Sequence, residues 1–344
     1  MIEIYNLTAH QEWDDIVRSF ADYDVYYLSG YVRAFYVHGD GEPQLLYYTS
    51  KQLRAIYVYM KRPTIITNVY DSVTPYGYGG VLFEGDKSDL SLSDFWKEYV
   101  QKMNDENIID NFVRYHPVLE NALHMKAISH VIDLGNTIAL DLSSPKVIWE
   151  NITSKNRNII RKAQKNNIQI HHTEDYSIFE HFISIYNQTM QRDNAEEYYY
   201  FQEEFYKAIH DYLKGNYQVF YATLDDQIIA VSIILYANKQ IHYHLSGSLS
   251  EYRSFAPTNL LLYEVALWGH QEGYKTFHLG GGLGSGNDNL YKFKAAFNRK
   301  SGLQFSIGKQ IFNQALYNQL VEERLAEDPN FDLESKYFPL YRAK

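Results

Sequence analysis

Lys294 is the side chain of this sequence that is best suited to chemistry. It follows a loop with five glycines in the segment HLGGGLGSGNDNLYKFKAAF, positions 278–297, where we expect a strand to end and a helix capped by Asp288 to begin. Three aromatic residues stand near it in the sequence, namely Tyr291, Phe293 and Phe297. In such surroundings an ammonium group could hold a carboxylate, a phosphate or a developing oxyanion. A lysine whose stem lies along an amphipathic helix is the alternative interpretation.

A cluster of basic residues is the second chemical feature. The segment TSKNRNIIRKAQKNNI, positions 153–168, starts with residues that favour a helix N-terminus and then shows helical spacing. Its basic residues are Lys155, Arg157, Arg161, Lys162 and Lys165. This density of positive charge in an acidic protein suits the binding of a pyrophosphate or an RNA backbone, and a solvated helix face is the alternative.

The segment HYHLSGSLSEYRSFAPTNLLLYEVALW, positions 242–268, predicts a strand that delivers Tyr243 and Ser246 toward a loop. Acetyl-CoA-dependent enzymes of the GNAT superfamily normally carry R/Q-x-x-G-x-G/A in such a loop, and its backbone N–H groups bind the pyrophosphate at a helix N-terminus. The corresponding stretch here, 253–257, reads RSFAP. It lacks both glycines and its proline removes one donor, so the sequence argues against CoA binding by this loop.

Arg192 and three consecutive tyrosines lie in TMQRDNAEEYYYF, positions 189–201. Arg192 could bind a phosphate, and tyrosines such as Tyr199 could stack on a base or a sugar, although structural roles explain these residues equally well. The histidines show neither HExxH nor a comparable metal-binding spacing, and no Ser-His-acid arrangement is readable. We therefore expect no metal.

The elements that must position these residues repeat in two halves. The first half predicts strands at 44–50 and 55–62, a loop at 74–80, a helix near 91–106 and a strand at 108–116. The second half predicts strands at 217–224, 228–237 and 241–247, a helix at 258–272 and a strand at 275–282. Both halves have the layout of a GNAT-type half. We predict an α+β protein with two tandem GNAT-like domains, 1–144 and 145–344, each a mixed central β-sheet flanked by helices.

Composition restricts the function classes. The 344 residues include no cysteine, which excludes a cysteine nucleophile, a disulfide and a thiolate metal site. The formal net charge of -10 disfavours a general nucleic-acid binder, so we expect no DNA partner, although a local basic patch remains compatible with RNA. No segment has the roughly 20 apolar residues of a membrane span, and the first residues lack the basic and apolar regions from which we would predict a signal peptide. We expect a cytoplasmic protein, for which peripheral membrane contact stays open.

Seven segments carry a family resemblance: YYLSGYVRAF (26–35), DSVTPYGYGG (71–80), VRYHP (113–117), SKNRNIIRKAQKN (154–166), YHLSGS (243–248), PTNLLLYEVALWGHQEGY (257–274) and HLGGG followed by LYKFKAAF (290–297). Over nearly its whole length the sequence resembles the Fem family, whose members transfer amino acids from aminoacyl-tRNA to the peptide stem of a cell-wall precursor. The chain has no coiled-coil insertion, so it is similar to the arm-less branch of that family.

The resemblance implies roles for individual residues. Arg33 and Arg192 would bind the nucleotide diphosphate of the precursor. The other substrate-binding residues would be Tyr76, Tyr78, Tyr199, Tyr243 and Ser246. Lys294 would act near the acyl donor, and Asp71 could be the base for the acceptor amine if burial raised the pKa of its carboxyl group. An aspartate that forms a turn is the alternative for Asp71.

Three functions follow from these features. The first is an aminoacyltransferase that uses aminoacyl-tRNA as co-substrate, the basic segment 153–168 as donor site, and a nucleotide- or lipid-linked peptide precursor as acceptor. It needs no other cofactor. The second is an N-acyltransferase that uses acyl-CoA and acts on an amino sugar or peptide of a surface polysaccharide. The third is a non-catalytic binding module with the same fold. The sequence leaves the oligomeric state open.

Overall fold

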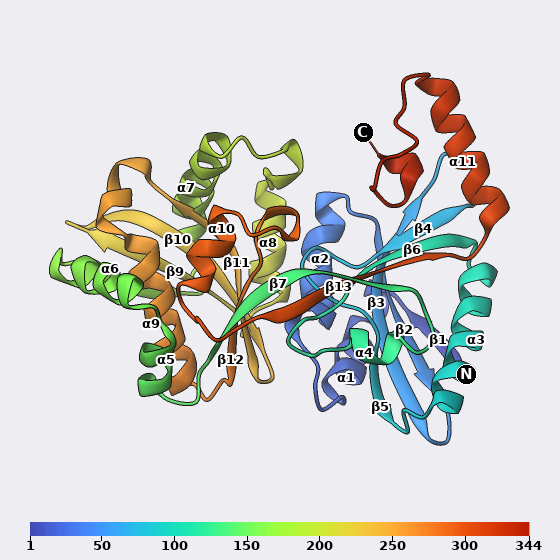
Figure 1. Cartoon of the computed structure of the whole chain (residues 1–344), viewed down its shortest axis with the longest axis horizontal. Helices are drawn as coiled ribbons and strands as arrows, with labels where there is room; N and C mark the ends of the chain where they lie inside the picture. Colours follow the sequence, from blue (N-terminus) through green and yellow to red (C-terminus); the bar gives the residue numbers. More distant parts are fainter. Residues whose placement is uncertain (344) are drawn as a thin grey trace. The chain divides into compact units, whose positions relative to one another are not determined.

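A computed structural model describes residues 1–343, which form two compact units (Figure 1). Unit 1 contains Met1–Leu134 and the chain from Phe305 onward, and unit 2 contains Gly135–Gln304. These units differ from the predicted domains, because the segment after Phe305 belongs to unit 1. Its strand β13 (Leu303–Ile311) pairs antiparallel with β6 (Ile108–Arg114) of the first half. Such a pairing between distant segments leaves no local signal in the sequence.

Unit 1 has a mixed sheet in the order β1-β2-β3-β4-β6-β13, and β5 pairs with β3. Its remaining strands are β1 (Ile2–Tyr5), β2 (Glu42–Thr49), β3 (Leu53–Pro63), β4 (Tyr70–Val73) and β5 (Leu82–Gly85). Neighbours pair antiparallel except β4 and β6, which run parallel and are connected through helix α3 (Asp89–Asp105). This connection is the crossover that a parallel pair requires.

The core of unit 1 lies between its sheet and α3. Leu92, Phe95, Tyr99 and Met103 recur on one face of α3 and pack against buried strand residues such as Tyr57 and Tyr59. The other helices of this unit are α1 (His10–Arg18), α2 (Ser29–His38), α4 (Ala122–Met125) and α11 (Gln314–Glu327). With 17 residues α3 is the longest helix of the described part, which therefore contains no coiled-coil arm.

Unit 2 has a mixed sheet in the order β7-β12-β11-β10-β9-β8. The strands are β7 (Val131–Asp141), β8 (Gln169–Thr173), β9 (Tyr217–Leu224), β10 (Gln227–Ala237), β11 (Gln240–Ser248) and β12 (Thr276–Gly280). β7 begins in unit 1, and its later part pairs with β12. Here β11 and β12 are the parallel pair, connected through helix α9 (Pro257–Gln271). Both units thus repeat the predicted order of strand, turn, strand, loop, helix and strand.

Helices cover the sheet of unit 2. They are α5 (Pro145–Asn151), α6 (Ser154–Lys165), α7 (Ile178–Arg192), α8 (Glu203–Tyr212), α9 and α10 (Asn289–Ala295). Helix α9 contributes Leu260, Leu261 and Val265 to the core, and α6 contributes Ile160. Helix α7 approaches β11 closely at Gly247, where a Cβ atom would lie 2.8 Å from the carbonyl oxygen of Ile185. None of the helices in the described residues has the length and apolar character of a membrane span.

Candidate active site

The parallel strands β11 and β12 of the unit 2 sheet are paired over only part of the length of β11. β11 and β12 pair only from Gln240 opposite Thr276 to His242 opposite His278, although β11 continues to Ser248. Beyond His242, β11 stays paired with β10 alone. The two central strands therefore diverge, which is the feature that admits substrate in the predicted GNAT layout.

A β-bulge on β11 brings Tyr243 and Ser246 to the same face. Tyr243 lies opposite Ile234 and Ser246 lies opposite Ser232, so β11 contains one residue more than β10 over this stretch. Strict alternation would place residues three apart on opposite faces. The two side chains interact instead, and burial raises the pKa of the Tyr243 hydroxyl while the contact with Ser246 opposes this rise. Ser246 donates to the carbonyl oxygen of Val231 at 3.0 Å.

Lys294 lies buried beside these two residues. Only 8% of its surface is exposed, so it does not extend along the outside of α10 into solvent. Its Nζ donates to the carbonyl oxygen of Gly281 at 2.7 Å and lies 6.0 Å from the centre of the Tyr243 ring. Burial lowers the pKa of Lys294 to about 8, against a smaller opposing effect of the Asp288 carboxylate. A buried ammonium with one neutral partner is able to bind a developing negative charge.

Asp288 caps α10, as the sequence predicts. Its Oδ1 accepts a hydrogen bond from the backbone N of Tyr291 at 2.8 Å, and its Oδ2 accepts one from the backbone N of Leu283 at 3.0 Å. These hydrogen bonds lower the pKa of the Asp288 carboxyl group. One carboxylate therefore connects the glycine loop to the helix that carries Lys294.

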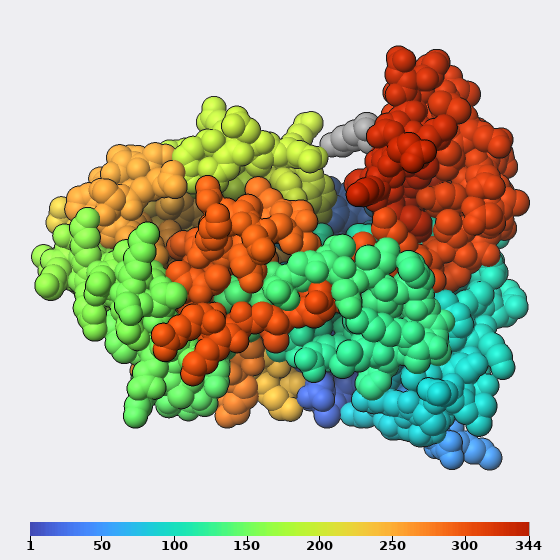
Figure 2. All heavy atoms as spheres, in the orientation of Figure 1, coloured from blue at the N-terminus to red at the C-terminus, as the bar shows by residue number. Residues whose placement is uncertain are grey.

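The basic helix α6 lies at the surface of unit 2 (green, at the left of Figure 2). Lys155, Arg161, Lys162 and Lys165 are exposed, and Arg157 is half-buried. Arg161 covers the ring of Trp149 at 5.0 Å, and Arg157 donates to the carbonyl oxygen of the same residue at 3.3 Å. Among the described residues none of the five basic side chains pairs with a carboxylate. The helix therefore presents positive charge that is available to an anionic ligand.

The loop before α9 has little capacity to bind a pyrophosphate. Residues Ser250–Phe255 form a 3-10 helix, in which backbone N–H groups bond to carbonyl oxygens three residues earlier. Ala256 then adopts a left-handed conformation with φ of 58°, its N–H bonds to Arg253, and Pro257 has no N–H. Lys162 of α6 donates to the carbonyl oxygen of Ser254 at 3.2 Å. The basic helix and this loop are thus direct neighbours.

Arg192 lies at the end of α7, where it contacts the end of β11. Its Nη1 donates to the carbonyl oxygen of Ser248 at 3.0 Å and to the hydroxyl of Ser250 at 3.3 Å, and its Nε is 3.0 Å from an oxygen of Asp193. Tyr199 is half-buried in a short 3-10 helix, with its ring against that of Tyr198 at 5.3 Å. The guanidinium is thus fixed beside the loop that follows β11.

Unit 1 contains the remaining predicted residues. Arg33 on α2 donates to the carbonyl oxygen of Leu7 at 3.3 Å. The loop at 74–80 carries Tyr76, whose ring stacks on Phe35 at 5.7 Å, and Tyr78, which is also half-buried. Whether these residues bind substrate stays a prediction.

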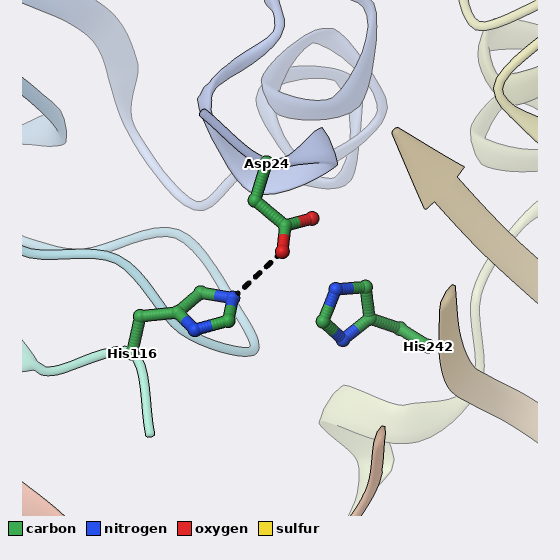
Figure 3. A group of neighbouring side chains, drawn as sticks. All are labelled: Asp24, His116 and His242. Atoms are coloured by element: carbon green, nitrogen blue, oxygen red, sulfur yellow. Dashed lines mark ion pairs between the residues drawn. The ribbon is translucent and has the colours of Figure 1, made fainter. Parts of the chain in front are cut away.

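A buried Asp24–His116 pair in unit 1 escaped the sequence analysis. Nε2 of His116 is 3.0 Å from Oδ2 of Asp24 (Figure 3). Nδ1 of His116 accepts a hydrogen bond from the backbone N of Leu119 at 3.2 Å. Oδ1 of Asn121 accepts a hydrogen bond from the backbone N of His116, and its Nδ2 donates one to the carbonyl oxygen of Gly79. Asn121 therefore connects the pair to the loop at 74–80. The motif VRYHP contains this histidine but gave no indication of its partner.

Asp71 is fully buried in a polar cluster of unit 1 whose two arginines are partly exposed. Its Oδ1 is 2.6 Å from Nε of Arg62, and its Oδ2 pairs with Arg342 and accepts a hydrogen bond from the Tyr341 hydroxyl at 3.0 Å. The Tyr341 hydroxyl is also 2.7 Å from Oδ2 of Asp110. Both oxygens of Asp71 are therefore engaged with strong donors. These contacts anchor the C-terminal segment to β4, and the role of Asp71 as a base stays an untested prediction.

The comparisons with known proteins agree with this geometry. Residues 154–295 match the model of the acetyltransferase (GNAT) domain family. The structure of FemX is similar with a TM-score of 0.69 and 14% identity, over 92% of this chain and 99% of that chain. The C-terminal DUF2156 domain of a putative lysylphosphatidylglycerol synthetase from Agrobacterium fabrum is similar with a TM-score of 0.60 and 15% identity, over 93% and 97% of the two chains.

L-PGS from Bacillus licheniformis is similar with a TM-score of 0.55 and 13% identity, over 94% of this chain and 99% of that chain. A comparison with curated protein sequences gave no significant match. At such low identity the solved structures show a shared fold. Residues 154–295 therefore match a GNAT acetyltransferase domain, and the chain is an acyltransferase with a tandem GNAT-like fold that resembles the structure of FemX.

Proposed function

We propose that the protein transfers an aminoacyl group from aminoacyl-tRNA to an amine of a nucleotide- or lipid-linked peptide precursor of the cell wall. The observation that supports this donor most directly is the loop before α9. Its amides are used within a 3-10 helix, whereas the basic helix α6 contacts the loop through Lys162 and Ser254. This surface suits an extended phosphodiester backbone better than the compact pyrophosphate of CoA. A reaction with this donor would take place in the cytoplasm.

The chemistry requires little from the protein beyond positioning and charge. The acceptor amine attacks the ester carbonyl, the carbonyl oxygen becomes an oxyanion, and the intermediate collapses to an amide and the terminal hydroxyl of the tRNA. The proton lost by the amine is the proton gained by that hydroxyl, so no covalent enzyme intermediate is needed. We assign the buried ammonium of Lys294 to the oxyanion or the departing oxygen. Tyr243 and Ser246 would orient the reacting groups beside it.

The acceptor site follows from the predicted precursor-binding residues. Arg192 beside the end of β11 would bind the diphosphate of the precursor, and Tyr199 would stack on its base or sugar. Arg33, Tyr76 and Tyr78 of unit 1 stay precursor-binding residues that the sequence alone predicts. The proposal includes no metal.

Charge reversal on α6 tests the donor assignment. We expect Arg157→Glu with Arg161→Glu to abolish transfer from aminoacyl-tRNA and to leave binding of the precursor UDP-MurNAc-pentapeptide unchanged. The matched control reverses Lys214 and Lys300, two exposed lysines of unit 2 outside α6, and changes the net charge equally. Filter binding of charged tRNA and a transfer assay give the readouts. Unchanged transfer by the α6 variant would show that the basic residues of this helix are only solvated and do not bind the donor.

Transfer from acyl-CoA to an amino sugar or peptide is the second candidate, and the match of residues 154–295 to an acetyltransferase domain favours it. A thermal-shift comparison separates the two. A ligand at about 100 times its Kd stabilises a protein by roughly 2.7 kcal/mol. Stabilisation by acetyl-CoA, with none by charged tRNA or the precursor, would support the second candidate against the first.

A further inference from the structure

Lys294 depends on the glycine loop for its orientation. Among the described residues, the carbonyl oxygen of Gly281 is the hydrogen-bond acceptor of its ammonium, at 2.7 Å. This carbonyl belongs to a loop that also contains Gly282, Gly284 and Gly286 and has no regular strand or α-helix of its own. An isolated loop of this composition would be flexible, so something must hold Gly281 in place.

Asp288 restrains both partners of the Lys294–Gly281 hydrogen bond, namely the loop that contains Gly281 and the helix that carries Lys294. Its Oδ2 accepts a hydrogen bond from Leu283 in the loop, and its Oδ1 accepts one from Tyr291 in the first turn of α10, the helix that carries Lys294. The loop packs tightly on this carboxylate. A Cβ atom on Gly282 would lie 2.3 Å from Oδ1 of Asp288 and 2.4 Å from the carbonyl oxygen of Gly286, so only glycine fits there.

The charge of Asp288 acts on Lys294 as well. The two backbone hydrogen bonds lower the pKa of the Asp288 carboxyl group, which is therefore ionised at neutral pH. Its negative charge opposes the effect of burial, which lowers the pKa of Lys294. No ion pair joins the two side chains within the described residues, so Asp288 acts at a distance and leaves the ammonium available to a substrate.

We infer that Asp288 is a positioning residue for Lys294: it holds the glycine loop so that the Gly281 carbonyl meets the ammonium, and it places a negative charge near that ammonium. The inference rests on the proposed function only in giving Lys294 a role at the reacting carbonyl. The positioning itself is a property of unit 2 and can be measured without a substrate.

Competitive acetylation of the intact protein with acetic anhydride tests the positioning. The acetylation rate of Lys294 as a function of pH, followed by peptide mass spectrometry, reports the pKa of its amine, and the exposed Lys292 on the same helix is the internal control. Asp288→Asn and Asp288→Ser both retain good helix-capping residues. We expect the Lys294 midpoint to fall in both variants, because a nearby opposite charge is lost. An unchanged Lys294 midpoint would overturn the inference.

Gly282→Ala separates geometry from charge, because it displaces the loop and retains both Asp288 and Lys294. We expect this variant to lower the titration midpoint of Lys294 as well. A midpoint equal to that of the wild type would show that Asp288 acts through its charge alone, and it would overturn the positioning through Gly281. A transfer assay keeps this test apart from the proposed function. If Asp288→Asn shifts the Lys294 midpoint while Lys294→Met retains full transfer, the positioning stands and the catalytic role of Lys294 fails.

Discussion

Each unit buries charge, but the two units compensate it differently. In unit 1 the carboxylate of Asp71 meets two guanidinium groups, from Arg62 and Arg342, and a tyrosine hydroxyl. In unit 2 the ammonium of Lys294 has one backbone carbonyl oxygen. A buried charge with a full set of partners holds segments together, whereas one with few partners retains electrostatic potential for a ligand. We therefore propose that the first cluster serves stability and the second serves chemistry.

Replacement of Lys294 should have the largest effect on function. We expect Lys294→Met to lower kcat by about 10²–10³-fold, the loss typical of an oxyanion-stabilising donor. Its melting temperature should stay close to that of the wild type, because the change removes a buried cation with few partners and retains an apolar stem. Steady-state transfer and a thermal melt measure the two quantities. A large loss of stability with retained kcat would place Lys294 with the structural cluster instead.

Replacement of Asp71 should give the opposite result. Asp71→Ala leaves Arg62 and Arg342 without their carboxylate, and breaking a buried ion pair in this way destabilises by about 3 kcal/mol. We take the low end of the usual range because both arginines are partly exposed. Chemical denaturation measures the loss. If the variant unfolds like the wild type but loses transfer, Asp71 is a base and the comparison between the units fails.

Asp110 offers a smaller, pH-dependent test of the same cluster. The Tyr341 hydroxyl has one hydrogen but lies within hydrogen-bond distance of Oδ2 of Asp71 and of Asp110. Because Asp71 is paired with two guanidinium groups, the second hydrogen belongs on Asp110. Burial, and then the charge of Asp71, raise the pKa of Asp110 to about 8.

A carboxyl group whose pKa is raised by folding stabilises the folded state fully below its unfolded pKa, near 4, and this contribution is lost as the pH rises through about 8. The asparagine side chain of the Asp110→Asn variant does not titrate. The stability of this variant relative to the wild type should therefore increase between pH 5 and pH 9. Denaturation curves across this range measure the difference. If the difference in stability between the variant and the wild type does not change with pH, Asp110 carries no proton in the folded protein.

Local patterns predicted much of the fold. The apolar segments of β9 and β10, the apolar helix α9 and the capping Asp288 are all local features, and they lie where the sequence predicts them. The pairing of β13 with β6 and the anchor of Tyr341 and Arg342 on Asp71 join distant segments. Neither leaves a periodicity in the sequence, so the C-terminal segment was assigned to the other half.

The candidate site shows the same division between local features, which the sequence predicts, and contacts between distant segments, which it does not. Lys294, Tyr243 and Ser246 were identified by residue type and context, and the structure brings them together. The β-bulge that places Tyr243 and Ser246 on one face depends on pairing with β10. The Asp24–His116 pair likewise depends on a contact between a loop and a strand end that are distant in the chain.

The most direct test of the account is a competition between donors. The purified protein is incubated with UDP-MurNAc-pentapeptide, a mixture of aminoacyl-tRNAs and acetyl-CoA, and the precursor is weighed by mass spectrometry, with Lys294→Met as the blank. We expect the precursor to gain one aminoacyl residue with the wild type and nothing with the variant. A product that carries only an acetyl group would contradict the proposed donor, and equal products from both proteins would contradict the assignment of Lys294.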